Sequence, residues 1–220
     1  MATLFLLRHG QAGDIMGDYD RLSPLGVEQC AAAGAHCPFV LPLAWARCGA
    51  MRRHRLSGEA FLGGLEPGLP LPINEDARWD EFDHQDVIKV GLAAGLGAMD
   101  AGGELPSFFH LAMGRWAGGA HDGDYREPYG AFYDRVQAAF DAACADLPAG
   151  GQAIIFTSGG VISAVCRRLL GLSPTAAFTV NSVLYNAGLT RVELGGGRRT
   201  LVQLNLNPAG DADPRLRTRR

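Results

Sequence analysis

Short apolar runs alternate along the chain with longer stretches in which apolar positions recur at helical spacing. The short runs are continuous, which is typical of strands buried on both faces of a sheet. They occupy 3–7, 152–157, 189–194 and 200–206. The helical spacing occurs at 24–35, 51–62, 106–117, 130–146 and 161–171. This alternation predicts an α/β fold, a three-layer α/β/α sandwich around a mostly parallel sheet with a helical insertion.

Two serine-proline pairs predict where helices begin. Ser23-Pro24 and Ser173-Pro174 each place a capping hydroxyl before a proline that suits the first helical turn. Gly171 lies between the second pair and the helical stretch before it, so we expect that helix to end there.

The chain of 220 residues is long enough for one domain with a substantial core, which we expect to span 1–206. The part at about 63–130 is rich in glycine and has little strand signal. This favours a helical insertion that packs over the sheet edge as a lid. The polar segment 207–220 contains prolines and ends in arginines, so it is expected to be a flexible tail.

Composition and charge narrow the classes of partner. The net charge of -3 provides no general attraction for nucleic acid or an anionic membrane, which leaves a small anionic substrate as the expected partner. The five cysteines are odd in number and lack Cys-x-x-Cys spacing, so neither a disulfide framework nor a zinc site is expected. No cofactor is expected. The apolar runs are too short to span a bilayer, and the first strand begins without a signal segment, which favours a cytoplasmic protein. The sequence leaves the oligomeric state open between monomer and dimer.

The first strand ends in an arginine, a histidine and a glycine, Arg8-His9-Gly10. A guanidinium binds phosphoryl oxygens with its planar fork, and an imidazole can attack phosphorus or transfer a proton. Glycine lets the backbone approach an anion closely. Because open α/β sheets bind ligands at the carboxyl ends of their strands, this triplet predicts a phosphate site.

Four further segments, taken with Arg8-His9-Gly10, indicate a family. They are Leu22-Ser23-Pro24-Leu25-Gly26-Val27-Glu28-Gln29, Gly49-Ala50-Met51-Arg52-Arg53-His54-Arg55, Trp79-Asp80-Glu81-Phe82 and Thr157-Ser158-Gly159-Gly160-Val161-Ile162. In this order and spacing they resemble the histidine phosphatase superfamily, whose fold is called phosphoglycerate mutase-like. The resemblance spans roughly 2–192.

The resemblance implies roles for residues of the first two motifs. His9 matches the nucleophile that forms a phosphohistidine, and Arg8 matches the first phosphate-binding arginine. The family motif Ser-x-Leu-x-Arg-Ala-x-x-Thr-Ala aligns Arg53 with the second phosphate-binding arginine and Ser57 with the threonine. The neighbouring arginines at 52 and 55 remain alternatives to Arg53.

The resemblance also implies a proton donor. The family places an acidic residue in a Leu-x-Glu segment, which corresponds to Glu81 here. Asp80 and Asp83 are nearby alternatives. A protonated carboxyl neutralises the departing alkoxide, and the carboxylate then takes a proton from water.

The chain departs from the family at its second core histidine. That histidine lies in a Ser-His-Gly-Gly segment, and here the position is Ser158. Losing one transition-state hydrogen-bond donor typically costs about 10²–10³ in rate. The serine hydroxyl and the N-terminus of the following helix can replace part of the lost donor, because Gly159 lets an anion come close. Thr157 is expected to add a contact.

Two side chains are expected to assist this pocket, His84 and Gln11. His84 lies three residues beyond Glu81, which puts both on one face if that segment is helical. We therefore hypothesise that His84 compensates for Ser158. Isolated histidines usually form local hydrogen bonds, and this is the default interpretation of the histidines at 54, 84, 110 and 121.

These observations favour a metal-independent phosphomonoester hydrolase that acts through a phosphohistidine on a small phosphorylated metabolite or a phosphoprotein. The alternative is a weak or inactive relative that binds a phosphorylated ligand or a protein partner. A phosphoglycerate mutase is less favoured. Aromatic residues within 83–130 are expected to form either a specificity wall or ordinary core. They are Phe108, Phe109, Trp116, Tyr125 and Tyr129.

Overall fold

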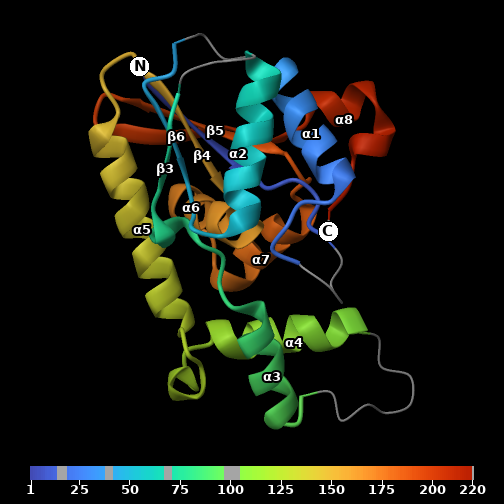
Figure 1. The fold of residues 1–220 in the computed structure, drawn as a ribbon. Coiled ribbons are helices and arrows are strands. Elements are labelled where there is room, and N and C mark those ends of the chain that lie inside the picture. Colours follow the sequence, from blue (N-terminus) through green and yellow to red (C-terminus); the bar gives the residue numbers. More distant parts are fainter. Residues whose placement is uncertain (14–18, 38–41, 67–70, 97–104, 220) are drawn as a thin grey trace.

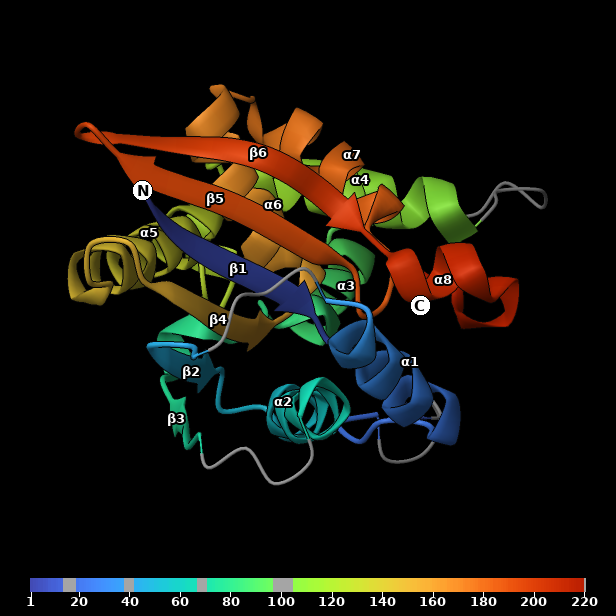
Figure 2. The same ribbon diagram turned by 90° about the horizontal axis from the view of Figure 1, so that it is seen from above.

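The computed structural model describes residues 1–13, 19–37, 42–66, 71–96 and 105–219. Its centre is a six-stranded sheet with the order β3-β2-β4-β1-β5-β6, which Figure 2 shows from above. The strands are β1 (Ala2–Arg8), β2 (Trp45–Cys48), β3 (Ile73–Glu75), β4 (Gln152–Thr157), β5 (Leu189–Gly195) and β6 (Arg198–Leu206). The strands β3, β2, β4 and β1 run parallel, whereas β5 and β6 pair antiparallel at the other edge. The prediction of an α/β fold with a mostly parallel sheet is confirmed.

Helices cover both faces of this sheet because its central strands are apolar on both sides. In β1, Leu4 and Leu6 belong to one hydrophobic cluster, and Phe5 and Leu7 belong to the other. The helices α1 (Pro24–Ala35) and α2 (Arg52–Leu65) pack against the second cluster, while α5 (Tyr129–Asp146) and α6 (Gly159–Leu170) pack against the first. Figure 2 shows these helix pairs on opposite sides of the sheet.

The helices α3 (His84–Ala93) and α4 (Leu105–Ala117) lie together at one end of the molecule, with α7 (Pro174–Val183) close to α4 (Figure 1). Short 3₁₀ turns, η1 (Ala77–Trp79) and η2 (Asp122–Asp124), complete this part of the chain. The expected insertion at 63–130 is therefore largely helical in its described residues. It also contributes β3, however, which pairs with β2 as an edge strand of the sheet.

The helix starts predicted from serine-proline pairs are confirmed. Ser23 Oγ accepts a hydrogen bond from Gly26 N at 3.0 Å, and Ser173 Oγ accepts one from Ala176 N at 3.1 Å. Gly171 ends α6 with a φ of 65°, a left-handed conformation that favours glycine.

The segment after β6 differs from the expected flexible tail. It forms α8 (Pro208–Ala212) and η3 (Pro214–Leu216), with Leu216 buried. Gln29 Nε2 donates to Leu216 O at 2.9 Å, and Asn186 N donates to Thr218 O at 2.9 Å. One buried leucine and these hydrogen bonds attach a segment of polar composition to the domain.

Candidate active site

The carboxyl ends of four parallel strands meet at one place in the fold. His9 follows β1 and Ser158 follows β4, and the register pairs Arg8 with Thr157. His9 N donates to Thr157 O, at the last residue of β4, over 2.8 Å, which continues the ladder one residue past the end of β1. The loops after β2 and β3 lead to Arg53 and Glu81 at the same edge. Parallel strands therefore bring distant sequence motifs together.

His9 is an almost fully buried imidazole with a defined tautomer. Its Nδ1 lies 2.7 Å from Gly10 O, and because a carbonyl only accepts, Nδ1 carries the proton. Burial, followed by the charges of Arg53 and Arg8, holds the pKa of His9 well below its usual value of 6.5. At neutral pH the ring is therefore neutral, with an unprotonated Nε2 available as a nucleophile.

Gly10 is required by close packing between β1 and α1. A Cβ at this position would lie 2.2 Å from Gly26 O. Gly10 N donates to Ser57 Oγ at 3.1 Å, and Ser57 Oγ donates to Arg53 O at 2.7 Å. Ser57 thus links the loop that carries His9 to the helix that carries Arg53.

The structure distinguishes the arginines of α2. Arg53 is buried with 5% of its surface exposed, and its charge acts on His9. Arg52 is exposed. Arg55 points toward β3, where Nη1 donates to Ile73 O at 3.5 Å and Nη2 pairs with Glu75 at 3.1 Å.

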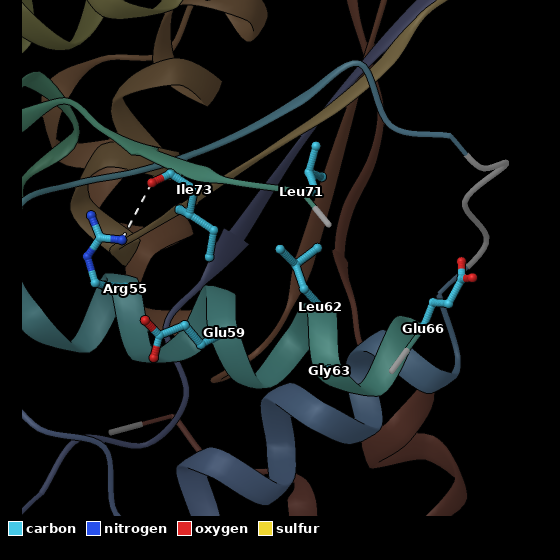
Figure 3. A pocket seen from close by; sticks show the side chains of 7 residues that line it. All are labelled: Arg55, Glu59, Leu62, Gly63, Glu66, Leu71 and Ile73. Carbon is cyan, nitrogen blue, oxygen red and sulfur yellow. Dashed lines mark hydrogen bonds between the residues drawn. The ribbon is translucent and has the colours of Figure 1, made fainter. Parts of the chain in front are cut away.

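Figure 3 shows Arg55 at one end of a cavity of about 360 Å³ between α2 and β3. The cavity is lined by Arg55, Glu59, Leu62, Gly63, Glu66, Leu71 and Ile73. This lining includes none of the residues that surround His9, so Arg53 is the arginine of α2 that faces the predicted site.

Arg8 and Arg53 each present a guanidinium with an unused donor. Arg8 Nη1 donates to Leu184 O, and Arg53 Nη1 pairs with Asp20 Oδ1 at 2.9 Å. The Nε atoms of both arginines are buried and have no hydrogen-bond partner among the described residues. Buried donors are nearly always satisfied in native proteins, so these two unpaired N–H groups are available to donate to an anion.

Glu81 is held against the first turn of α6. Its Oε2 accepts from Gly160 N at 2.9 Å, and its Oε1 accepts from Phe82 N at 3.2 Å. Burial raises the pKa of Glu81 above 4.5, although these hydrogen bonds and the charge of Arg53 act in the opposite direction. The carboxyl therefore keeps its proton to a higher pH than an exposed glutamate does.

The two alternative carboxylates have structural contacts. Asp80 Oδ1 accepts from Met51 N at 3.2 Å, immediately before α2 begins. Asp83 Oδ1 accepts from Asp86 N at 3.0 Å and caps α3. Glu81 is the acidic residue of this segment that contacts α6.

The paired glycines at the start of α6 make room for two polar side chains. A Cβ on Gly159 would lie 2.1 Å from Asn181 Oδ1 and 3.6 Å from Arg8 Nε. A Cβ on Gly160 would lie 2.1 Å from Glu81 Oε1. Any larger residue at either position would displace a group that borders the pocket.

Sequence reasoning missed one member of this site, His54. Its Nε2 lies 2.6 Å from Ser158 Oγ, and both side chains are fully buried. The rings of His54 and His9 lie 6.0 Å apart, centroid to centroid. A sequence signal was present, because an imidazole directly follows Arg53 within the arginine motif where the family has alanine.

The helical face that was expected to hold both Glu81 and His84 does not form. α3 begins at His84, so Glu81 lies before the helix and the two residues do not share a helical face. The His84 ring packs against Tyr19, with centroids 5.6 Å apart, whereas the imidazole bonded to Ser158 is that of His54.

The other expected contributors have structural partners. Gln11 Oε1 accepts from Ser23 Oγ at 3.0 Å, next to the start of α1. Thr157 Oγ1 donates to Trp79 O at 2.6 Å, which holds the segment leading to Glu81 against β4.

The aromatic residues of the insertion separate into core and surface. Trp116, Tyr125 and Tyr129 are buried and belong to the hydrophobic core. Phe109 is 38% exposed and lines a cavity of about 310 Å³ between α4 and α7. The full lining is Phe109, His110, Met113, Phe178, Thr179, Asn181 and Ser182. Asn181 belongs both to this lining and to the contact with Gly159, so the cavity adjoins the pocket.

Among the described residues, no cluster of histidine, cysteine or acidic side chains is suited to hold a metal ion. None of the helices in the described part of the chain has the length and apolarity needed to cross a membrane.

Comparisons with known proteins show the family and the fold of this chain. A model of the histidine phosphatase superfamily (branch 1) matches residues 4–207. No curated protein was found that matches the chain. Three solved structures with this fold are 17%, 17% and 20% identical to this chain in sequence.

Phosphoglycerate mutase from Bacillus anthracis is 17% identical, and the match covers 94% of this chain and 94% of the mutase, with a TM-score of 0.68. Alpha-ribazole phosphatase from Shigella flexneri is 17% identical over 93% of this chain and 96% of its own, with a TM-score of 0.62. Mycobacterial glucosyl-3-phosphoglycerate phosphatase is 20% identical, and the match covers 92% of this chain and 98% of the phosphatase, with a TM-score of 0.62. From the match to residues 4–207, this chain belongs to the histidine phosphatase superfamily, branch 1.

Proposed function

We propose that this protein hydrolyses small phosphomonoesters through a phosphohistidine on His9. The observation that carries this proposal is the state of the His9 ring. It is buried, it is neutral at pH 7, and its Nδ1 proton is held by Gly10 O, which leaves the Nε2 lone pair free. An uncharged imidazole beside two arginines is suited to attack a phosphoryl group.

The first half of the reaction transfers the phosphoryl group to the enzyme. The guanidinium groups of Arg8 and Arg53 bind the equatorial oxygens, where negative charge spreads in the transition state. His9 Nε2 forms a bond to phosphorus as the bond between phosphorus and the ester oxygen breaks. The Glu81 carboxyl gives its proton to that oxygen, so the substrate leaves as a neutral alcohol.

The second half releases phosphate. Water attacks the phosphorus of the phosphohistidine, and the Glu81 carboxylate accepts a proton from that water. The bond between Nε2 and phosphorus breaks, and the lone pair returns to His9. Glu81 is again protonated, and inorganic phosphate leaves the site.

We place Ser158 at the position of the family's second core histidine, with Gly159 beside the bound phosphoryl group. Burial and the α6 N-terminus support this assignment, because N–H groups at the start of a helix favour an anion. The alcohol part of the substrate lies in the cavity between α4 and α7. Phe109 and Met113 make that cavity suited to an alcohol with an apolar portion.

The test is hydrolysis of para-nitrophenyl phosphate by the wild type and by His9→Ala, in the presence of a metal chelator. We expect turnover by the wild type that is lost in His9→Ala. Rapid quenching should trap a phosphoenzyme that is labile in acid and stable in alkali, as a phosphoramidate is. Equal rates for the two proteins would refute the hydrolase and favour a relative that only binds phosphorylated ligands.

A further inference from the structure

Ser158 and His54 form a buried pair that joins two elements of the site. Ser158 stands at the N-cap of α6, and His54 lies in the first turn of α2. Both side chains have none of their surface exposed, and Oγ and Nε2 are 2.6 Å apart. A contact this short between fully buried groups is a strong hydrogen bond that restricts both side chains.

The pair faces the reacting imidazole. The centroid of the His54 ring lies 6.0 Å from that of His9. Within α2, Arg53 directly precedes His54, and on β4 the residue before Ser158 is the register partner of Arg8. Arg53 is therefore next to the pair in sequence, and Arg8 lies on the neighbouring strand.

The hydroxyl of Ser158 is not used as a helix cap. A serine at this position normally accepts a hydrogen bond from an N–H of the first turn, but Ser158 makes no such bond. The Gly160 N–H is bonded to Glu81 instead. When His54 Nε2–H donates to Ser158 Oγ, the Ser158 hydroxyl proton remains to be donated to a third group.

The other side of the His54 ring is enclosed by the protein. A Cβ on Gly49 would lie 2.3 Å from His54 Nδ1, so glycine is needed for the ring to occupy this place. Asp80 Oδ1 is 3.7 Å from Nδ1, which is too long for a hydrogen bond. Among the described residues, Ser158 is therefore the group whose hydrogen bond orients the ring.

We propose that His54 is a positioning residue that makes Ser158 a phosphoryl donor of this site. His54 holds the serine oxygen, and the serine hydroxyl proton points to an equatorial oxygen of the group being transferred from substrate to His9. The pair thereby supplies the donor that a histidine at position 158 would supply alone. This inference rests on the proposed phosphohistidine chemistry of His9.

A double-mutant cycle tests whether the two residues act as one unit. The variants are His54→Ala, Ser158→Ala and the double variant, assayed with para-nitrophenyl phosphate. Each single change should lower kcat about 10²–10³-fold, the usual loss for one transition-state donor, with a much smaller change in KM. The double variant should be no slower than the worse single variant, because removing either residue disables the pair.

Relocation of the imidazole is the second test. The double variant His54→Ala, Ser158→His moves the imidazole from α2 to the N-cap of α6. Its kcat should be roughly tenfold or more above that of His54→Ala. His54→Gln keeps most of the side-chain volume and a donor for Ser158, so it should remain folded and lose less activity than His54→Ala. His36→Ala changes an exposed histidine at the C-cap of α1 and should leave kcat unchanged.

Three results would overturn the inference. They are full activity in folded His54→Ala, additive losses in the cycle, and no recovery in the relocated variant while His54→Gln remains active. The comparison of wild type with His9→Ala identifies failure of the proposed function separately. If the wild type shows no turnover, the variants are compared by their affinity for vanadate instead of by their kcat.

The vanadate measurement uses the same proteins. Weaker binding by His54→Ala, restored in the relocated variant, would support the pair. Equal affinities, or no binding by the wild type, would refute it.

Discussion

The carboxylate of Glu81 lies against the backbone of Gly160, with Oε2 accepting from Gly160 N at 2.9 Å. The contact joins the loop after β3 to the first turn of α6, and it is possible only because residue 160 has no Cβ. The same carboxyl has a raised pKa because it is buried. A backbone contact therefore places the acid that the proposed reaction requires.

Replacing Gly160 by alanine should displace Glu81. The new Cβ would lie 2.1 Å from Oε1 and 2.8 Å from the Phe82 ring, so the carboxylate must move. Loss of general acid and base catalysis typically costs about 10²–10⁴, and we expect kcat to fall at least about 10²-fold. The matched control is Gly114→Ala in α4, where a Cβ would meet no atom within 4 Å. Its kcat should be unchanged, and equal kcat in both variants would contradict this role for Glu81.

Removing the acid should make the rate depend more steeply on the leaving group. Glu81→Gln keeps the shape of the side chain but cannot give a proton to the departing oxygen. Para-nitrophenolate leaves without help, whereas an alkoxide does not, so the variant should lose far more activity toward alkyl phosphates. The measurement is kcat/KM over a series of esters. Asp83→Asn, which retains a capping side chain on α3, should follow the wild-type series.

The pH profile of kcat should be bell-shaped, with its maximum between the pKa of His9 and the pKa of Glu81. The first step needs neutral His9, whose pKa lies well below 6.5, and protonated Glu81, whose pKa lies above 4.5. Activity falls toward acid as His9 gains a proton and toward alkali as Glu81 loses one. In Glu81→Gln the alkaline limb should vanish for para-nitrophenyl phosphate. A wild-type profile that is flat across this range would contradict the pairing.

Stability should fall as the pH drops below about 6.5, the value for an unfolded histidine. Burial lowers the pKa of both His9 and His54, so the unfolded chain binds protons that the native protein does not. Each such histidine destabilises the fold by up to about 1.4 kcal/mol per pH unit below 6.5. The free energy of unfolding, measured in urea across this range, should fall less steeply in His54→Gln. The exposed His36→Gln should keep the wild-type slope.

The cavity between α4 and α7 should select the alcohol part of the substrate. Phe109 is 38% exposed in its lining, so Phe109→Ala removes apolar contact without opening the core. We expect KM for aryl phosphates to rise by roughly three- to tenfold, from the loss of about 1 kcal/mol of contact. Leu111→Ala changes a residue of α4 that is 53% exposed and outside this lining, and its KM should not change. A KM for Phe109→Ala equal to that of the wild type would show that the alcohol part of the substrate does not bind in this cavity.

The pattern of apolar residues was sufficient for the central strands and the long helices. β1 and β4 are continuous apolar runs because both faces of the sheet are covered, and such runs are recognisable without a structure. β2 and β3 escaped prediction because they have only 4 and 3 residues, too few for a recognisable pattern. Their strand conformation comes from pairing with a neighbour, which is a tertiary interaction.

For the chemistry, the sequence by itself determined the triplet Arg8-His9-Gly10 and the acidic segment that contains Glu81. Each of these is a short run of neighbouring residues whose side chains suggest a role without knowledge of the fold. Only the tertiary structure decided which arginine of α2 faces His9 and which histidine meets Ser158. His54 and Ser158 are 104 residues apart, and their contact depends on the parallel pairing of β2 with β4 and on the direction in which α2 leaves β2. A local sequence pattern cannot indicate such a contact, because the contact forms only when distant parts of the chain pack together.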